Sequence, residues 1–127
     1  MIYRAPRTVH CSICDCCVES MDHHCPWLSG CIGKRNYYSY FVLINALWLN
    51  AFFVILNESI DIQTRVDYFS SFGSEEPTSD ALKSHPISVV LAVLGMVALA
   101  GLSLLVTYHY KITVEGLTTH EDVKSVF

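Results

Sequence analysis

The sequence has no cysteine after Cys31, although it holds six in all. A secreted protein stabilised by disulfides spreads its cysteines over the chain and begins with an apolar signal peptide, whereas residues 1–10 are polar and contain Arg4 and Arg7. The sequence also lacks an excess of positive charge, because Asp and Glu total 12 against 8 Lys and Arg, a formal net charge of −4. These shortages argue against a disulfide scaffold and against a nucleic-acid-binding protein.

Charged side chains are missing from two long apolar segments, residues 37–56 and residues 86–110. Each segment is long enough to cross a bilayer as a helix, and tyrosines at the start of the first fit the interfacial zone. A buried hairpin of a soluble protein is the alternative, although neither segment has a polar face. Small residues recur on one helical face of the second segment, as in close helix packing: Ser88, Ala92, Gly95 and Ala98. The sequence therefore predicts an all-α membrane protein with two transmembrane helices.

The three remaining segments flank these helices. Residues 1–36 are rich in turns and lack a sustained apolar period, residues 57–85 form an acidic loop, and residues 111–127 form a short tail. The two outer segments contain six basic residues: Arg4, Arg7, Lys34, Arg35, Lys111 and Lys124. The loop between the apolar segments contains only two, Arg65 and Lys83. The positive-inside rule then predicts both termini in the cytosol and the loop in the lumen.

Cysteine and histidine side chains crowd into the N-terminal segment with CxxC spacing: His10, Cys11, Cys14, Cys16, Cys17, His23, His24, Cys25 and Cys31. On the reducing, cytosolic side of a membrane this pattern predicts zinc ligation. The segment is too small to bury a core, so its fold must depend on metal bonds. If every one of these side chains bound metal, however, none would remain for chemistry.

The tetrapeptide Asp22-His23-His24-Cys25 holds an acid, two imidazoles and a thiol without a spacer. A thiol is a good nucleophile only as the thiolate, and a neighbouring imidazole can take its proton. A carboxylate beside that imidazole fixes its tautomer and raises its basicity. The tetrapeptide can therefore supply a nucleophile, a base and an orienting acid, with one histidine to spare.

These motifs together resemble a known family. The run from His10 to Tyr37 resembles the cysteine-rich core of the DHHC protein S-acyltransferases, and the tail from Gly116 to Asp122 resembles their TTxE motif. The residues of this tail motif are most similar to those of the Ras-palmitoylating branch of the family. The resemblance covers nearly the whole chain. It implies an enzyme with four transmembrane helices in the full family and a zinc-bound segment on the cytosolic face. That enzyme moves a palmitoyl group from acyl-CoA, through a thioester on Cys25, to a cysteine of a substrate protein.

The resemblance also implies roles for single residues. The family has two interlocking zinc sites, and by motif position one set of ligands is Cys11, Cys14, His24 and Cys31, while His10 and Cys17 belong to the other. Cys25 is then the nucleophile, His23 its base and Asp22 the residue that orients His23. The alternative is that Cys25 is a plain zinc ligand. Cys16 departs from the usual spacing and is either a spare thiol or an acylation site.

Other residues keep two interpretations each. Trp27 is expected near the thioester or as an interfacial anchor. Basic side chains can hold the phosphates of coenzyme A or meet anionic lipid: Arg4, Arg7, Lys34 and Arg35. Thr118 and Glu121 form a capping box that starts a helix, and the family places this motif against the catalytic segment as structural support. Gly30 stands where the family usually has Asn, and Tyr40 where it often has Phe.

The resemblance further implies membrane lipid, substrate proteins with a membrane-proximal cysteine and a small accessory subunit as partners, and the endoplasmic reticulum or Golgi as the location. A catalytically inactive, membrane-anchored zinc module that binds proteins is the alternative function. The second zinc site lacks two ligands, which the family supplies as a CxxC pair that would fall just before Met1. We therefore expect a longer natural chain, and a chain of these 127 residues that holds about one zinc and has little activity.

Overall fold

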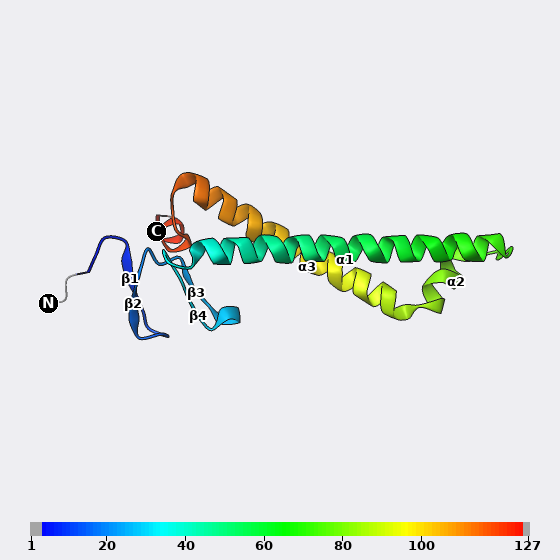
Figure 1. Ribbon diagram of the computed structural model, residues 1–127, viewed down its shortest axis with the longest axis horizontal. Coiled ribbons are helices and arrows are strands. Elements are labelled where there is room, and N and C mark those ends of the chain that lie inside the picture. The colour runs from blue at the N-terminus through cyan, green and yellow to red at the C-terminus, as the bar shows by residue number, and fades with distance from the viewer. Residues whose placement is uncertain (1–3, 126–127) are drawn as a thin grey trace. The chain divides into compact units, whose positions relative to one another are not determined.

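The computed structural model describes residues 4–125 and is helical over most of its length after the first 36 residues (Figure 1). Two antiparallel hairpins come first: β1 (Thr8–Cys11) pairs with β2 (Cys16–Glu19), and β3 (His23–Cys25) pairs with β4 (Gly30–Ile32). A 3-10 turn, η1 (Pro26–Leu28), lies between β3 and β4. The helices are α1 (Tyr37–Ser71), α2 (Pro77–Ser84), α3 (Pro86–Glu115) and α4 (Thr119–Ser125).

The chain divides into two compact units. Unit 1 consists of Met1–Ile44 together with Leu105–Phe127, and unit 2 is Asn45–Leu104. Unit 1 therefore contains both hairpins, the first part of α1, the last part of α3 and α4. Unit 2 contains the rest of the two long helices and α2.

Local turn chemistry shapes the two hairpins. Asp15 ends the turn between β1 and β2 with a φ of 49°, and Ser29 follows η1 with the same φ; a small polar side chain tolerates this left-handed conformation better than most. Gly33 follows β4, where a Cβ atom would meet Val18 Cγ1 at 2.7 Å and the Glu19 carbonyl oxygen at 2.9 Å. Only glycine lets the two hairpins approach this closely without displacing either strand.

Local contacts hold the chain where each long helix meets the rest of unit 1. Asn36 precedes α1, accepts a hydrogen bond from the Gly33 amide at 2.9 Å and donates one to the Cys31 carbonyl at 3.0 Å, which fixes the turn between β4 and α1. Gly116 ends α3 with a φ of 69°, and the Leu117 amide reaches back to the Ile112 carbonyl at 2.9 Å, as in a Schellman motif that caps the helix.

The predicted capping box is present at the start of α4. The Thr118 amide donates to Glu121 Oε2 at 2.9 Å, and the Glu121 amide donates to Thr118 Oγ1 at 3.3 Å.

The small core of unit 1 consists of Cys25, Ile32, Tyr40 and Ile44, with Tyr37, Phe41 and Val106 packed against it.

The helices are longer than the apolar segments that predicted them. α1 begins at Tyr37 as expected but continues past Leu56 to Ser71, and α2 occupies part of the segment expected to be a loop. Side-chain pairs one turn apart extend α1 in polar sequence: Arg65 with Asp61 at 2.9 Å and Gln63 with Asp67 at 3.0 Å. The apolar character of the sequence is therefore lost before the helix ends.

Within unit 2, small residues of α3 face α1. Ser88 donates a hydrogen bond to Asp61 Oδ2 at 3.1 Å, and a Cβ atom on Gly95 would lie 3.0 Å from Ile55 Cγ1. Trp48 Nε1 donates to Ser103 Oγ at 2.8 Å. The close packing expected from the small-residue face is therefore present at Ser88 and Gly95.

Both long helices are long and apolar enough to cross a membrane. Only 17% of the most apolar stretch of α1, and 6% of that of α3, is buried inside the protein. A core helix of a soluble protein would be mostly buried, so these two are candidate membrane spans whose apolar side chains lack a protein cover among the described residues.

Candidate functional site

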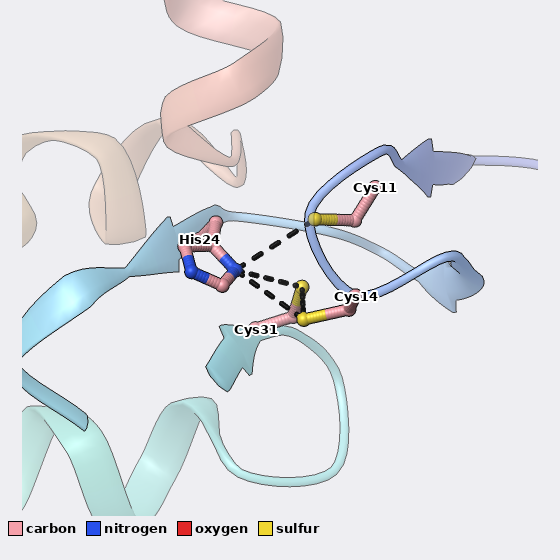
Figure 2. Close-up of side chains that lie close together, drawn as sticks. All are labelled: Cys11, Cys14, His24 and Cys31. Carbon is pink, nitrogen blue, oxygen red and sulfur yellow. Dashed lines mark hydrogen bonds between the residues drawn. The ribbon is translucent and has the colours of Figure 1, made fainter. Parts of the chain in front are cut away.

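Four predicted ligands come together at one point of unit 1 (Figure 2). His24 Nδ1 lies 3.3 Å from Cys14 Sγ and 3.7 Å from both Cys11 Sγ and Cys31 Sγ, and the Cys14 and Cys31 sulfurs are 3.5 Å apart. A tetrahedral site with bonds of about 2.0–2.3 Å spaces its ligand atoms by roughly 3.3–3.8 Å. The donor set and its spacing therefore fit a single metal ion.

The hairpins explain why these four side chains meet. Cys11 ends β1 and Cys14 lies in the following turn, while His24 and Cys31 are cross-strand partners in the second hairpin. Burial and the neighbouring Cys11 and Cys14 sulfurs raise the pKa of Cys31 to about 12, whereas the Cys14 backbone amide lowers the pKa of Cys11 to about 7. A cation would relieve the repulsion among thiolates that this crowding creates.

The two ligands predicted for a second zinc site are cross-strand partners in the first hairpin. His10 Nδ1 lies 3.9 Å from Cys17 Sγ, and His10 Nε2 lies 3.6 Å from Asp15 Oδ1. Within residues 4–125 they do not belong to a group of three or more ligand atoms that could hold a metal. Cys16 is exposed on β2 and is likewise outside the four-ligand cluster.

A second constellation runs through Asp22, His23 and Cys25. Asp22 is 1% exposed, and its Oδ2 lies 2.7 Å from His23 Nδ1. The other ring nitrogen is thereby left for the Cys25 thiol, and the two side chains are close enough to influence each other's pKa. Cys25 is buried and is not one of the four clustered ligands. The structure thus brings together an acid, an imidazole and a free thiol.

Thr119, at the start of α4, holds Asp22 from the far end of the sequence. Its backbone amide donates to Asp22 Oδ1 and its hydroxyl donates to Asp22 Oδ2, both at 2.8 Å. Glu121, two residues on, binds Arg7 through Nε at 2.6 Å and Nη2 at 2.5 Å, and Arg7 also donates to the Gly116 carbonyl at 3.1 Å. The tail motif is therefore attached to the acid of the constellation and to the segment before β1.

The electrostatics of this constellation favour charge separation. Burial alone raises the pKa of Asp22, but hydrogen bonds from His23 and Thr119 outweigh it and lower the pKa. The hydrogen bond to Asp22 raises the pKa of His23. Burial also acts to raise the pKa of Cys25, yet the Leu28 and Trp27 amides and the His23 side chain lower it overall. A thiolate beside an imidazolium is therefore stabilised at this position.

A tyrosine and a second histidine, neither of them part of the motif, lie against His23. Its ring meets Tyr40 edge-on with centroids 5.1 Å apart, and the His109 centroid lies 6.1 Å away. Tyr40 and His109 are both buried. The sequence offered one signal for His109, which is that no other acidic or basic side chain occurs in residues 86–110.

The residues expected to hold coenzyme A are on the surface, and two of them have acidic partners. Arg7 is bound to Glu121, and Lys34 pairs with Glu19. Lys34 and Arg35 line a surface pocket of about 520 Å³ beside β2, while Arg4 is exposed. Trp27, in η1, is 92% exposed, so its ring does not pack on the described part of the protein.

Comparison with known proteins shows which sequences this chain resembles. A family model described as DHHC palmitoyltransferase matches residues 1–126. Palmitoyltransferase ZDHHC18 of Mus musculus is 39% identical over 124 residues, which is 97% of this chain and 30% of the relative. Palmitoyltransferase ZDHHC14 of Mus musculus is 37% identical over 97% of this chain and 24% of its own length. Protein S-acyltransferase 8 of Arabidopsis thaliana is 34% identical over 98% of this chain and 29% of its own length. The chain thus spans less than a third of each of these relatives.

Proposed function

Because this chain belongs to the DHHC palmitoyltransferase family, we propose that it transfers a long-chain acyl group, such as palmitoyl, from acyl-CoA to a cysteine of a substrate protein. The observation that carries the proposal is the hydrogen-bonded series Thr119, Asp22 and His23, with the Cys25 thiol beside His23 and outside the four-ligand cluster. A structural metal site needs no such series. Nucleophilic catalysis by a thiol does.

In the first step Cys25 acts as the nucleophile. Its proton passes to His23, and the thiolate sulfur attacks the carbonyl carbon of the acyl-CoA thioester. A new bond forms between that carbon and Cys25 Sγ, the bond from the carbon to the coenzyme A sulfur breaks, and the departing sulfur takes the proton from His23. Asp22 stabilises the charged imidazole in the interval, since it accepts from Nδ1 at 2.7 Å.

In the second step the roles repeat with a different thiol. The cysteine of the substrate protein gives its proton to His23, and its sulfur attacks the acyl carbon on Cys25. The bond to Cys25 breaks, and the proton on His23 returns to Cys25 Sγ. The acyl group ends on the substrate protein, and the enzyme is restored without an oxidant or a reductant.

Zinc is the metal that we propose for the cluster of Cys11, Cys14, His24 and Cys31, because three thiolates and an imidazole are a common structural zinc set. When bound there, zinc supplies structural cross-links and takes no part in acyl transfer. Coordination of His24 would restrict the movement of its neighbour Cys25 and of η1. His10 and Cys17 would serve a second zinc site that needs ligands beyond those the described residues supply.

For the coenzyme A phosphates we propose Lys34 and Arg35, which line the same surface pocket beside β2. Lys34 pairs with Glu19 and Arg7 with Glu121, so each of them must exchange this acidic partner for a phosphate when coenzyme A binds. Arg4 and Trp27 are exposed at the surface, and we propose that they meet the membrane or the thioester end of the substrate. The apolar helices α1 and α3 would hold the acyl chain in the lipid.

We also propose that the cysteine-rich segment faces the cytosol and that the stretch around Gly73 faces the lumen, on the distribution of basic residues. An epitope inserted next to Gly73 should be shielded from protease in sealed microsomes, whereas a tag after Phe127 should be cleaved. Gly73 has a φ of 77° and open space around it, so an insertion beside it disturbs little. Cleavage at both positions would contradict the proposed orientation.

The experiment that tests the function is acyl labelling of the natural protein, purified in detergent and incubated with palmitoyl-CoA. We expect a hydroxylamine-sensitive acyl group that mass spectrometry maps to Cys25, and its loss in Cys25→Ser. Cys16→Ser is the matched control, because Cys16 is also outside the four-ligand cluster but lacks the His23 partner. Labelling that survives in Cys25→Ser and disappears in Cys16→Ser would overturn the proposal, and no labelling at all would favour a metal-bound interaction module.

A further inference from the structure

His109 is a buried histidine on α3 that the proposed reaction does not use. It is 2% exposed, and both of its ring nitrogens have partners in unit 1: Tyr37 Oη lies 3.1 Å from Nδ1, and Tyr40 Oη lies 3.3 Å from Nε2. Burying a polar ring costs free energy unless its nitrogens are hydrogen-bonded, so the two tyrosine hydroxyls stabilise it there.

The direction of these hydrogen bonds follows from Thr113. Its hydroxyl donates its one proton to the His109 carbonyl at 2.6 Å, so it can only accept from Tyr37 Oη, which lies 3.1 Å away. Tyr37 has then used its own proton and must accept from His109 Nδ1. A neutral imidazole that donates at Nδ1 accepts at Nε2, and therefore Tyr40 donates there. The chain of donors fixes the tautomer of His109 and the hydroxyl direction of Tyr40.

Tyr40 connects this chain to His23. The Tyr40 ring meets His109 edge-on at a centroid distance of 5.1 Å and meets His23 edge-on at the same distance. The His23 side chain is 26% exposed, so part of its ring is open and part is held by neighbours. Asp22 and Cys25 act on the two nitrogens of His23, but contacts at the nitrogens alone still allow the ring plane to tilt. The rings of Tyr40 and His109, which lie against His23, oppose that tilt.

We propose that His109 is a positioning residue for acyl transfer: it anchors Tyr40, and Tyr40 keeps the His23 imidazole aligned between Asp22 and Cys25. The inference rests on the proposed function, because alignment of His23 matters only if His23 exchanges a proton with Cys25. It adds a residue of α3, 86 positions from His23, to the motif-encoded site. A misplacement of about 1 Å in such a constellation can slow a reaction about a hundredfold.

The main test is His109→Leu in the natural protein in detergent. We expect the rate constant for acylation of Cys25 by saturating palmitoyl-CoA to fall about tenfold to a hundredfold, with KM for palmitoyl-CoA and zinc content unchanged. Trp48→Phe is the control, since it removes an interhelical hydrogen bond to Ser103 in unit 2 and should leave the rate constant unchanged. An unchanged rate constant in His109→Leu, or a loss of zinc in parallel with the rate, would overturn the inference.

Conservative variants separate positioning from mere packing. The side-chain amide of Gln reaches as far as Nε2 and can accept from Tyr40, whereas that of Asn reaches only the Nδ1 position. His109→Gln should therefore recover more of the rate than His109→Asn, although both fill the site with a polar group. Tyr40→Phe keeps the ring against His23, so its acylation rate constant should fall only about twofold to fivefold. In Tyr40→Leu the rate constant should fall as much as in His109→Leu. The reverse order in either pair would contradict the proposed route through Tyr40.

A readout that does not depend on acyl transfer keeps the inference distinct from the proposed function. In a Cys16→Ser background, the rate of Cys25 alkylation by iodoacetamide reports how well His23 activates the thiol. We expect His109→Leu to slow this alkylation about tenfold with the same bound metal. If the protein forms no acyl thioester and yet His109→Leu slows alkylation, the proposed function fails and the positioning role stands. If thioester forms and alkylation is unchanged, the positioning role fails alone.

Discussion

Most buried side chains of the described residues belong to unit 1, whereas unit 2 buries only Ala51 and Ala81 among them. The two buried polar side chains, Asp22 and His109, are both in unit 1, and each has hydrogen-bond partners from a distant part of the sequence. Unit 2 leaves long apolar side chains uncovered along both helices. Unit 1 thus has a small interior of its own, in which apolar side chains and hydrogen-bonded polar side chains are buried together, whereas the long helices of unit 2 leave apolar surface that lipid or further helices could cover.

Removal of the metal should produce the largest difference in stability between the two units. Structural zinc contributes about 10–16 kcal/mol to the folding of small zinc modules, and the hairpins of unit 1 have no large core of their own. Chelation of the purified protein should make the segment from β1 to β4 sensitive to protease while α1 and α3 remain helical by circular dichroism. Equal protection of the hairpins with and without chelator would show that they do not depend on metal.

Gly33→Ala tests whether the two hairpins of unit 1 must approach closely. The added methyl group would meet Val18 Cγ1 at 2.7 Å and the Glu19 carbonyl at 2.9 Å, so we expect a loss of about 1–3 kcal/mol in the free energy of unfolding of unit 1. Gly30→Ala is the matched control, because its methyl group would meet only the Leu28 carbonyl at an ordinary 3.7 Å. Thermal unfolding followed by protease sensitivity of the hairpins measures both, and equal stability of the two variants would contradict the packing argument.

Thr119→Val tests the link between the tail and the site. The variant loses the hydrogen bond from the Thr119 hydroxyl to Asp22 but keeps the one from the backbone amide. The lost hydrogen bond contributes about 1 kcal/mol to the orientation of Asp22, so the acylation rate constant should fall roughly fivefold. KM for palmitoyl-CoA should stay the same. Thr118→Val instead breaks the capping box at Glu121 and should act on the stability of α4 before it acts on the rate. A rate loss confined to Thr118→Val would refute the role given to Thr119.

The smallest effect is expected from the ion pair between Arg7 and Glu121, which is largely exposed. The hydrogen bond from Arg7 lowers the pKa of Glu121 to about 2, below its ordinary value of 4.5. The pair therefore contributes fully above about pH 4.5 and is lost as the pH falls toward 2. The difference in free energy of unfolding between the parent protein and Arg7→Gln should be below about 1 kcal/mol at pH 7 and shrink at pH 3. If this difference in the free energy of unfolding instead grew as the pH fell, the proposed contribution of the ion pair would be contradicted.

The sequence predicted some parts of this structure because their signals are local. The starts of α1 and α3 and the capping box at Thr118 follow from short local patterns, whereas the grouping of Cys11, Cys14, His24 and Cys31 was implied by the family resemblance. The length of α1 did not follow, because pairs such as Arg65 with Asp61 extend a helix beyond its apolar part.

The resemblance placed the tail motif against the catalytic segment, but the particular contacts between distant residues did not follow from the sequence. The bond from Thr119 to Asp22 spans 97 positions, and Tyr37 and Tyr40 lie 72 and 69 positions from His109. Arg7 and Lys34 were expected to bind phosphate on charge alone, and the fold gives each an acidic partner that composition cannot indicate. Charge and spacing name the candidates, and only the fold determines which of them meet.

The division between metal ligand and nucleophile is the central claim for unit 1, and two cysteine variants test it most directly. Cys25→Ser and Cys31→Ser each remove one thiol from the second hairpin, and Cys25 and Gly30, the neighbour of Cys31, are cross-strand partners in it. The measurement is bound zinc per chain, together with acyl labelling, in both purified variants. We predict that Cys25→Ser keeps the zinc of the parent protein and loses the acyl label, whereas Cys31→Ser loses zinc. Equal loss of zinc in the two variants would show that Cys25 is a ligand and would contradict the account.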